Sequence, residues 1–168
     1  MLSMDTHDEI DRIDLKILGE LSANGRISWR DLAERIGLTL TPTLRRVRHL
    51  EEAGYIKGYS AHLDEARLAG GMSVFVAVSL ERQSQDHIDA FEREIAVAPT
   101  VMSCFMITGD ADYILRVVVN DLNEYQVFLT STLLKIRGVA HIKSSFALKS
   151  VLNRAAPLLP TGQRRKPR

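Results

Sequence analysis

Residues 37–50 read GLTLTPTLRRVRHL, the pattern of a turn that leads directly into a short basic helix. Gly37 is suited to ending a helix, and Thr39 can cap the next one by accepting a hydrogen bond from a backbone N–H. Pro42 falls in the first helical turn, where amides have no partner inside the helix, so its missing N–H costs little. The segment therefore predicts a helix that begins at about Thr39.

The predicted helix has two chemically different sides. At 100° per residue, Leu40, Leu44, Val47 and Glu51 share one side, which we expect to face a core. The other surface carries Arg45 and His49 opposite the core, Thr41 and Pro42 beside them, and Arg46 and Arg48 on the flanks. This arrangement is typical of a helix that packs on a core with one face and meets a polyanion with the other.

Two further helices are predicted before this segment. Apolar residues recur at helical spacing before the break at Asn24-Gly25, and again after the capping residue Ser28. These residues are Ile10, Ile13, Ile17 and Leu21 in the first helix, and Trp29, Leu32, Ala33 and Ile36 in the second. The tight link to the third helix has the spacing of a helix-turn-helix motif. The alternative is a small all-α subdomain with a solvated arginine face.

Composition limits the class of protein. The chain has 168 residues, enough for one domain or two small ones, and a net charge of +1, so no global positive field indicates nucleic-acid binding. Five basic residues lie near the C-terminal end: Arg154, Arg164, Arg165, Lys166 and Arg168. Without them the rest of the chain is net acidic. The basic groups available to phosphate are therefore those of the third helix and of this tail, residues 153–168, which we expect to be disordered.

Several kinds of site are excluded by the sequence. The single cysteine, Cys104, allows no intramolecular disulfide and lies in an apolar run, where a buried thiol is expected. The five histidines have no metal-ligand spacing, and neither a Ser/His/Asp order nor a phosphate loop is present. We therefore predict no catalytic residue, metal or cofactor. The sequence shows neither a signal peptide nor a membrane span, so the expected location is the cytoplasm, with no membrane partner.

The second half of the chain has a different periodicity. Residues 55–71 are expected to form a connector, first a short strand pair or extended segment and then a helical turn. Alternating or helical apolar patterns then predict strand 72–80, helix 85–97, strand 101–108, strand 113–119, a helix from 121 to Gly138, and strand 139–148. This βαββαβ order predicts an α+β fold, with a ferredoxin-like antiparallel sheet that has both helices on one face. The predicted domains are residues 1–54 and 72–152, on either side of the connector.

The other face of the predicted sheet carries Phe75 and Ala77 and needs a cover. Pairing with a second copy of the chain is the natural way to provide one. We therefore expect a homodimer.

Three motifs in this order resemble the Lrp/AsnC (leucine-responsive/asparagine) family of transcription regulators. They are the opening helix at residues 11–18 (DRIDLKIL), the basic segment at residues 37–51, and the acidic glycine turn at residues 109–113 (GDADY). The resemblance covers nearly the whole chain. Leu40 stands where many members have proline. Residues 144–149 (SSFALK) differ from the leucine regulator and look more like a branch of the family with other or broader amino-acid effectors.

The resemblance implies that the helix-turn-helix domain, which is winged in this family, places its third helix in the major groove of double-stranded DNA. Arg45, at the centre of the exposed face, is suited to bidentate hydrogen bonds with guanine, and Thr41, Thr43, Arg46 and Arg48 to phosphate contacts. His49 is suited to either role. The complete predicted DNA-binding set is Thr39, Thr41, Pro42, Thr43, Arg45, Arg46, Arg48 and His49.

The resemblance also implies an amino-acid effector near the turn at residues 109–113, at an interface between dimers, and an octamer as the final assembly. From the residues alone, Gly109, Asp110 and Asp112 have either a structural role in the turn or a binding role, because carboxylates and free amides suit a zwitterion. We assign Asp112 to the ammonium group. Tyr113 completes the turn, and Ser144, Ser145 and Phe146 are predicted to form a wall of the site.

The predicted function is a sequence-specific DNA-binding regulator that responds to an amino acid and controls amino-acid metabolism or transport genes. Two alternatives stay open. Ferredoxin-like domains also serve enzymes as amino-acid-sensing regulatory subunits, and a helix-turn-helix can act as an interaction adaptor without DNA.

Overall fold

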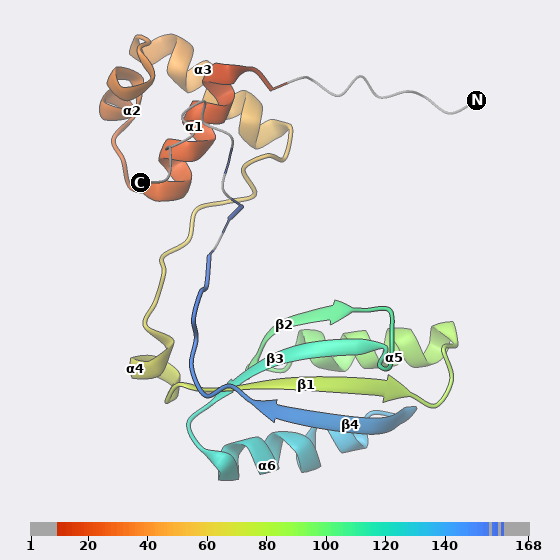
Figure 1. Cartoon of the computed structure of the whole chain (residues 1–168). Helices are drawn as coiled ribbons and strands as arrows, with labels where there is room; N and C mark the ends of the chain where they lie inside the picture. Colours follow the sequence, from red (N-terminus) through yellow and green to blue (C-terminus); the bar gives the residue numbers. More distant parts are fainter. Residues whose placement is uncertain (1–9, 155, 158, 160–168) are drawn as a thin grey trace, which may run out of the picture. The chain divides into compact units, whose positions relative to one another are not determined.

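The computed structural model describes residues 10–154, 156, 157 and 159, and it divides into two compact units (Figure 1). One unit contains the described residues up to Ala61 and those from Leu152 onward, and the other is His62–Val151. Most of the basic tail lies outside the described residues, so the expected disorder of that tail stays a prediction. Among the described helices, none is long and apolar enough to cross a membrane.

The first unit consists of three helices, α1 (Arg12–Ala23), α2 (Trp29–Ile36) and α3 (Leu40–Glu52). As predicted, Ser28 caps α2, because its hydroxyl accepts a hydrogen bond from the N–H of Asp31. Gly37 ends α2 in the left-handed conformation, with φ of 76°. Because that turn is so short, α3 follows α2 at once, which is the helix-turn-helix arrangement.

The first unit has its own hydrophobic core, formed by Ile17, Leu21, Ile27, Leu32, Ile36, Val47 and Leu50. The predicted buried side of α3 is partly wrong. Thr43, Val47 and Leu50 are the buried residues of this helix, whereas Leu40 is 43% exposed and Glu51 is exposed. Burial of Thr43 is possible because its hydroxyl donates to the carbonyl oxygen of Thr39 at 2.9 Å. The core face is therefore rotated away from Leu40.

The connector contains one short helix. Residues 55–63, all of which the structure describes, form no strand or helix, so the extended alternative holds and the strand pair does not. Helix α4 (Glu65–Ala69) follows, capped by Asp64 and ended by Gly70. A Cβ atom on Gly70 would lie 2.3 Å from the Cα atom of Asn120, so only glycine fits there.

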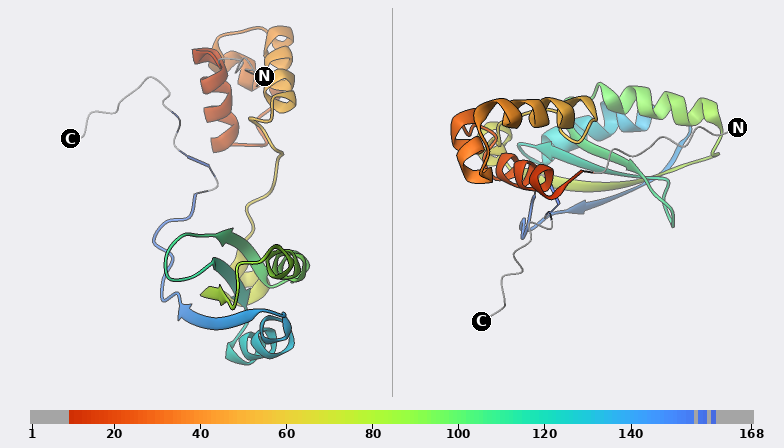
Figure 2. Two further views of the ribbon diagram at one scale, coloured as in Figure 1. Left: turned by 90° about the vertical axis from the view of Figure 1, so that its right-hand side faces the viewer. Right: turned by 90° about the horizontal axis from the view of Figure 1, so that it is seen from above.

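After α4, the second unit is a four-stranded antiparallel sheet with two further helices. Its elements are β1 (Met72–Leu80), α5 (Gln85–Ala96), β2 (Val101–Met106), β3 (Tyr113–Val119), α6 (Leu122–Ser131), a 3₁₀ turn (Leu133–Lys135) and β4 (Val139–Phe146). The strand order is β2-β3-β1-β4. Both helices cover the same face, as the left view of Figure 2 shows, and their Phe91, Ile95, Tyr125 and Phe128 pack on Val74, Val76 and Val78 of β1. The predicted ferredoxin-like fold is confirmed.

The main difference from the predicted elements lies in α6, which was expected to continue to Gly138 but ends at Ser131. The hydroxyl groups of Thr130 and Ser131 donate to carbonyl oxygens of the preceding turn, at Gln126 and Val127. Such side-chain bonds compete with the helical pattern and favour an end to the helix.

Candidate functional site

The outer surface of α3 is basic. Thr41, Arg45, Arg48 and His49 are exposed, and together with Leu44 and Glu52 they line a shallow hollow. Val47 and Leu50 anchor the opposite side of the helix in the core, where they are 2% and 0% exposed. A rigidly packed helix therefore presents two guanidinium groups to solvent, and guanidinium groups suit base edges and phosphates.

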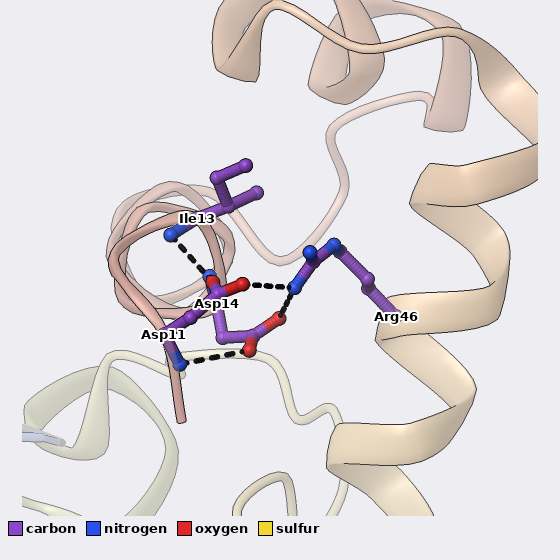
Figure 3. Close-up of polar contacts among 4 residues, drawn as sticks. All are labelled: Asp11, Ile13, Asp14 and Arg46. Atoms are coloured by element: carbon purple, nitrogen blue, oxygen red, sulfur yellow. Dashed lines mark hydrogen bonds and ion pairs between the residues drawn. The ribbon is translucent and has the colours of Figure 1, made fainter. Parts of the chain in front are cut away.

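Arg46 lies in a different environment from Arg45 and Arg48 (Figure 3). Its Nη1 atom is 2.7 Å from Oδ2 of Asp11 and 2.8 Å from Oδ1 of Asp14. The Asp14 side chain is only 9% exposed. The predicted phosphate contact by Arg46 is therefore not supported by this geometry, because the guanidinium already has two carboxylate partners.

Hydrogen bonds hold both aspartates at the start of α1. The Asp11 carboxylate accepts from the N–H groups of Ile13 and Asp14, and the Asp14 carboxylate accepts from the N–H of Asp11, which makes a capping box. The Asp14 N–H, followed by the Arg46 guanidinium and the Ile13 N–H, lowers the pKa of the Asp11 carboxyl group. The hydrogen bond to Asp14, and after it the bond to Asp11, raises the pKa of Arg46.

The remaining predicted DNA-binding residues differ in their exposure to solvent. Thr43 is 0% exposed, so its predicted contact with DNA is not supported by this conformation. Thr39 is exposed, but its side chain makes no capping hydrogen bond, contrary to expectation. Pro42 is half-buried in the first turn of α3. The predicted DNA-binding residues that are exposed in the structure are therefore Thr39, Thr41, Arg45, Arg48 and His49.

The acidic glycine turn joins β2 to β3. Gly109 has φ of 129°, a value that favours glycine. Asp112 holds the turn to the sheet: one carboxylate oxygen accepts from the N–H of Leu80 at 2.7 Å, and the other accepts from the side-chain amide of Gln83. The Asp110 side chain is exposed. Asp112 thus has a structural role in the turn, whether or not it also binds a ligand.

Tyr113 belongs to the core of the second unit, where it borders a hollow that is also lined by residues of α5 and β2. It is 1% exposed, its ring lies 4.4 Å from that of Phe91, and its hydroxyl donates to Glu92 at 2.9 Å. Burial, followed by the bond to Glu92, raises the pKa of Tyr113. The prediction that Tyr113 contacts an effector is therefore not supported by its position.

The predicted wall on β4 is divided between the two faces of the sheet. Ser144 hydrogen-bonds with the Tyr125 hydroxyl, and the centroids of the Phe146 and Tyr125 rings lie 5.4 Å apart in a T-shaped arrangement, so both lie on the helix-covered face. Ser145 pairs with Phe75 and lies on the open face. Tyr125, which contacts both of these β4 residues, is not among the predicted site residues.

The turn and the end of β4 do not meet within one chain. Phe146 pairs with Val74 and Tyr113 with Val78, which places them four residues of β1 apart. That spacing is about 13 Å along the strand, and β4 and β3 lie on opposite sides of β1. Among the described residues, no cluster of three His, Cys, Asp or Glu side chains is placed to hold a metal ion.

Comparison with known proteins gives matches over both units. Residues 73–157 match the model of the Lrp/AsnC ligand binding domain, and residues 10–57 match a winged helix-turn-helix DNA-binding domain. The chain is 67% identical over 151 residues to the Bkd operon transcriptional regulator of Pseudomonas aeruginosa, covering 90% of this chain and 99% of the relative. It is 38% identical over 143 residues to the leucine-responsive regulatory protein of Escherichia coli, covering 85% and 87%.

A solved structure shows the same architecture. A transcriptional regulator from Neisseria meningitidis, crystallised with L-Met, superposes with a TM-score of 0.86 at 35% identity, covering 92% of this chain and all of the other. These relatives are transcriptional regulators and not enzymes, which confirms the expectation of a non-enzymatic function.

Proposed function

The chain belongs to the Lrp/AsnC family of transcription regulators, and from this premise we propose that it controls an operon of amino-acid metabolism or transport in response to an amino-acid effector. The first candidate target is a Bkd operon, because the Pseudomonas aeruginosa relative is named for that operon. The first candidate effectors are leucine and L-methionine. The Escherichia coli relative is named as leucine-responsive, and the Neisseria meningitidis structure is a complex with L-Met.

The observation that carries the DNA-binding proposal is the exposed basic face of α3. Arg45 is exposed at the middle of that face, with Thr41, Arg48 and His49 around it. We assign Arg45 to a guanine edge in the major groove and Arg48 and Thr41 to phosphates. Glu52 borders the same hollow and repels phosphate, so the contacts concentrate toward the N-terminal and central turns of the helix.

The effector proposal combines the turn at residues 109–112 of one chain with β4 of another. The two regions lie at opposite ends of β1 within one chain, so a single chain presents an incomplete site. An effector that bridges them binds only the assembled oligomer. By linkage, such an effector also stabilises that oligomer relative to its separated parts.

The test of DNA recognition measures the affinity of the full chain for duplex DNA from upstream of the candidate Bkd operon and for a scrambled duplex. Arg45→Ala should lose discrimination between the two duplexes by about tenfold or more, since one bidentate contact is worth about 1–3 kcal/mol. The matched control is Arg93→Ala, because Arg93 is an exposed arginine of α5 in the other unit. This variant should discriminate between the duplexes as the wild type does. Unchanged discrimination in Arg45→Ala would overturn the assignment of α3.

A further inference from the structure

Arg46 lies next to Arg45 in sequence, but its side chain joins α3 to α1 (Figure 3). The Arg46 side chain is 28% exposed and that of Asp14 is 9% exposed, so this ion pair is mostly shielded from water. Asp11, whose side chain is 47% exposed, makes the second contact. The cluster of Asp11, Asp14 and Arg46 therefore joins the first turn of α1 to the middle of α3.

The two carboxylates of this cluster are held in place by backbone hydrogen bonds that do not involve Arg46. The Asp11 carboxylate accepts two backbone N–H groups, at 2.7 and 2.9 Å, and the Asp14 carboxylate accepts one, at 3.0 Å. These bonds tie both carboxylates to the α1 backbone. A guanidinium group bound to two such fixed oxygens has little freedom to move along or around α1.

The other contacts of α3 restrain it less specifically. Val47 and Leu50 bury apolar surface, and apolar packing is non-directional. The charged hydrogen bonds from Arg46 are directional and lie beside the residue that faces solvent at position 45. A small rotation of α3 about its axis would break them before it emptied the core.

We propose that Arg46 is a positioning residue for DNA recognition, which with Asp11 and Asp14 sets the rotation of α3 and thereby the direction of the Arg45 side chain, without contacting DNA itself. This inference rests on the proposed role of α3 as the DNA-reading helix. Withdrawing Arg46 toward a phosphate would leave Asp14 buried with an unpaired charge, which opposes such a movement.

The opposite assignment, Arg46 as a phosphate contact, predicts different results for two variants. If Arg46 binds phosphate, then Asp14→Asn frees the guanidinium and raises affinity for operator and scrambled DNA alike. Arg46→Ala would then also reduce the slope of log affinity against log salt by about 0.9. If Arg46 positions α3, both variants lower discrimination by up to about tenfold and leave the salt slope at its wild-type value.

The experiment titrates fluorescent operator and scrambled duplexes with the full chain at several salt concentrations. The variants are Asp14→Asn, Arg46→Ala and Arg46→Lys, with Arg48→Ala as the reference for lost phosphate contact. Arg46→Lys keeps a charged donor and should recover part of the discrimination. Circular dichroism melting checks the fold of each variant. If Asp14→Asn does not fold, Asp11→Asn removes the more exposed of the two ion pairs instead.

Three results would overturn the inference. They are a reduced salt slope in Arg46→Ala, a general gain of affinity in Asp14→Asn, and a lower melting temperature with unchanged discrimination, which would make the cluster a stabilising ion pair only. Failure of the proposed function gives a different result, because Arg45→Ala would then also keep wild-type discrimination. Lost discrimination in Arg45→Ala but not in the Asp14 and Arg46 variants would contradict the positioning role alone.

Discussion

Neighbouring residues of α3 differ in their surroundings and therefore in their roles. Arg45 faces solvent, while Arg46 is held by two carboxylates and Thr43 is enclosed by the core. The identity of a basic residue in a recognition helix therefore does not determine its role. What determines it is the partner available within reach, and for Arg46 one such partner, Asp14, is 32 residues earlier in the chain.

The lowered pKa of the Asp11 carboxyl group predicts that acid destabilises the first unit. Its folded-state pKa is lowered, so its contribution to stability is present above the ordinary aspartate value of about 3.9 and is lost as the pH falls through the lowered value. We expect the melting temperature of the wild type to fall as the pH decreases below about 4.

The control for this effect is Asp11→Asn, which has no carboxyl group to protonate at this position. At neutral pH its melting temperature should be lower than that of the wild type, and it should decrease less as the pH is lowered. Circular dichroism melting from neutral pH to below the aspartate pKa range measures both. Parallel pH profiles for the wild type and the variant would show that Asp11 does not contribute.

At the turn, Asp112 has a structural role that any effector test must separate from binding. We expect Asp112→Ala to abolish the heat of amino-acid binding and also to lower stability by about 1–3 kcal/mol, because the Leu80 N–H and the Gln83 amide lose their acceptor. Isothermal titration calorimetry with each of the twenty amino acids, L-leucine and L-methionine first, measures the binding.

Asp110→Ala is the matched variant, since Asp110 is an exposed carboxylate two residues away. It should retain stability, and any loss of binding should be smaller than that in Asp112→Ala. The opposite pattern, with binding lost in Asp110→Ala and kept in Asp112→Ala, would transfer the ammonium contact to Asp110. No heat with any amino acid would leave the turn with a structural role only.

At the scale of elements, most of the helices and strands could be predicted from local patterns. The limits of β1 follow from a two-residue period, in which Val74, Val76 and Val78, with Met72 and Leu80 at the ends, share one face. Ser28 and Gly37 mark the ends of α2 by their own chemistry. The same alternation rule places Ser145 on the opposite face from Ser144 and Phe146, so the division of the predicted wall was also available from sequence.

Other features depend on contacts that local patterns do not contain. Thr43 is polar, yet its hydroxyl is satisfied within the helix, and this allows the buried face of α3 to pass through it rather than through Leu40. The Arg46 ion pairs and the bond between Tyr125 and Ser144 join residues far apart in sequence. Helical and strand periodicity describe only which residues share a face, so such pairs were missed.

The junction between α4 and β1 offers a prediction about backbone conformation. Gly70→Ala should destabilise the second unit by about 2 kcal/mol or more, because a left-handed φ of 77° is combined with a Cβ atom 2.3 Å from Asn120. Urea unfolding followed by circular dichroism measures the change.

Gly54→Ala separates the effect of the positive φ from the effect of the steric clash. Gly54 has φ of 78°, and a Cβ atom added there would point into open space among the described residues, so alanine introduces backbone strain without a clash. Its cost should be about 1 kcal/mol. If both variants lose the same free energy of unfolding, the contact with Asn120 does not contribute to the destabilisation.

At the scale of the whole molecule, the open face of the sheet indicates self-association. Phe75 on β1 and Phe105 on β2 lie on the face opposite the helices, and they are 42% and 61% exposed. We expect Phe75→Glu to convert the oligomer to monomer, because pairing two copies would bury a charge without a partner. Multi-angle light scattering at micromolar concentration measures the mass.

Val127→Glu is the control, since Val127 is 59% exposed on α6, which covers the other face. It should leave the dimer intact. A dimer that survives Phe75→Glu would exclude the open face as the contact. A fully monomeric wild type would show that the exposed aromatic residues of the sheet serve another purpose.

The alternation of anchored and solvent-facing residues along α3 has an evolutionary consequence. Thr43, Arg46, Val47 and Leu50 hold the helix, whereas Arg45 and Arg48 can change without disturbing that support. Mutations at the two exposed positions are therefore nearly neutral for folding. After gene duplication, a copy of this regulator can acquire a new set of target genes through one or two substitutions while its scaffold is inherited unchanged.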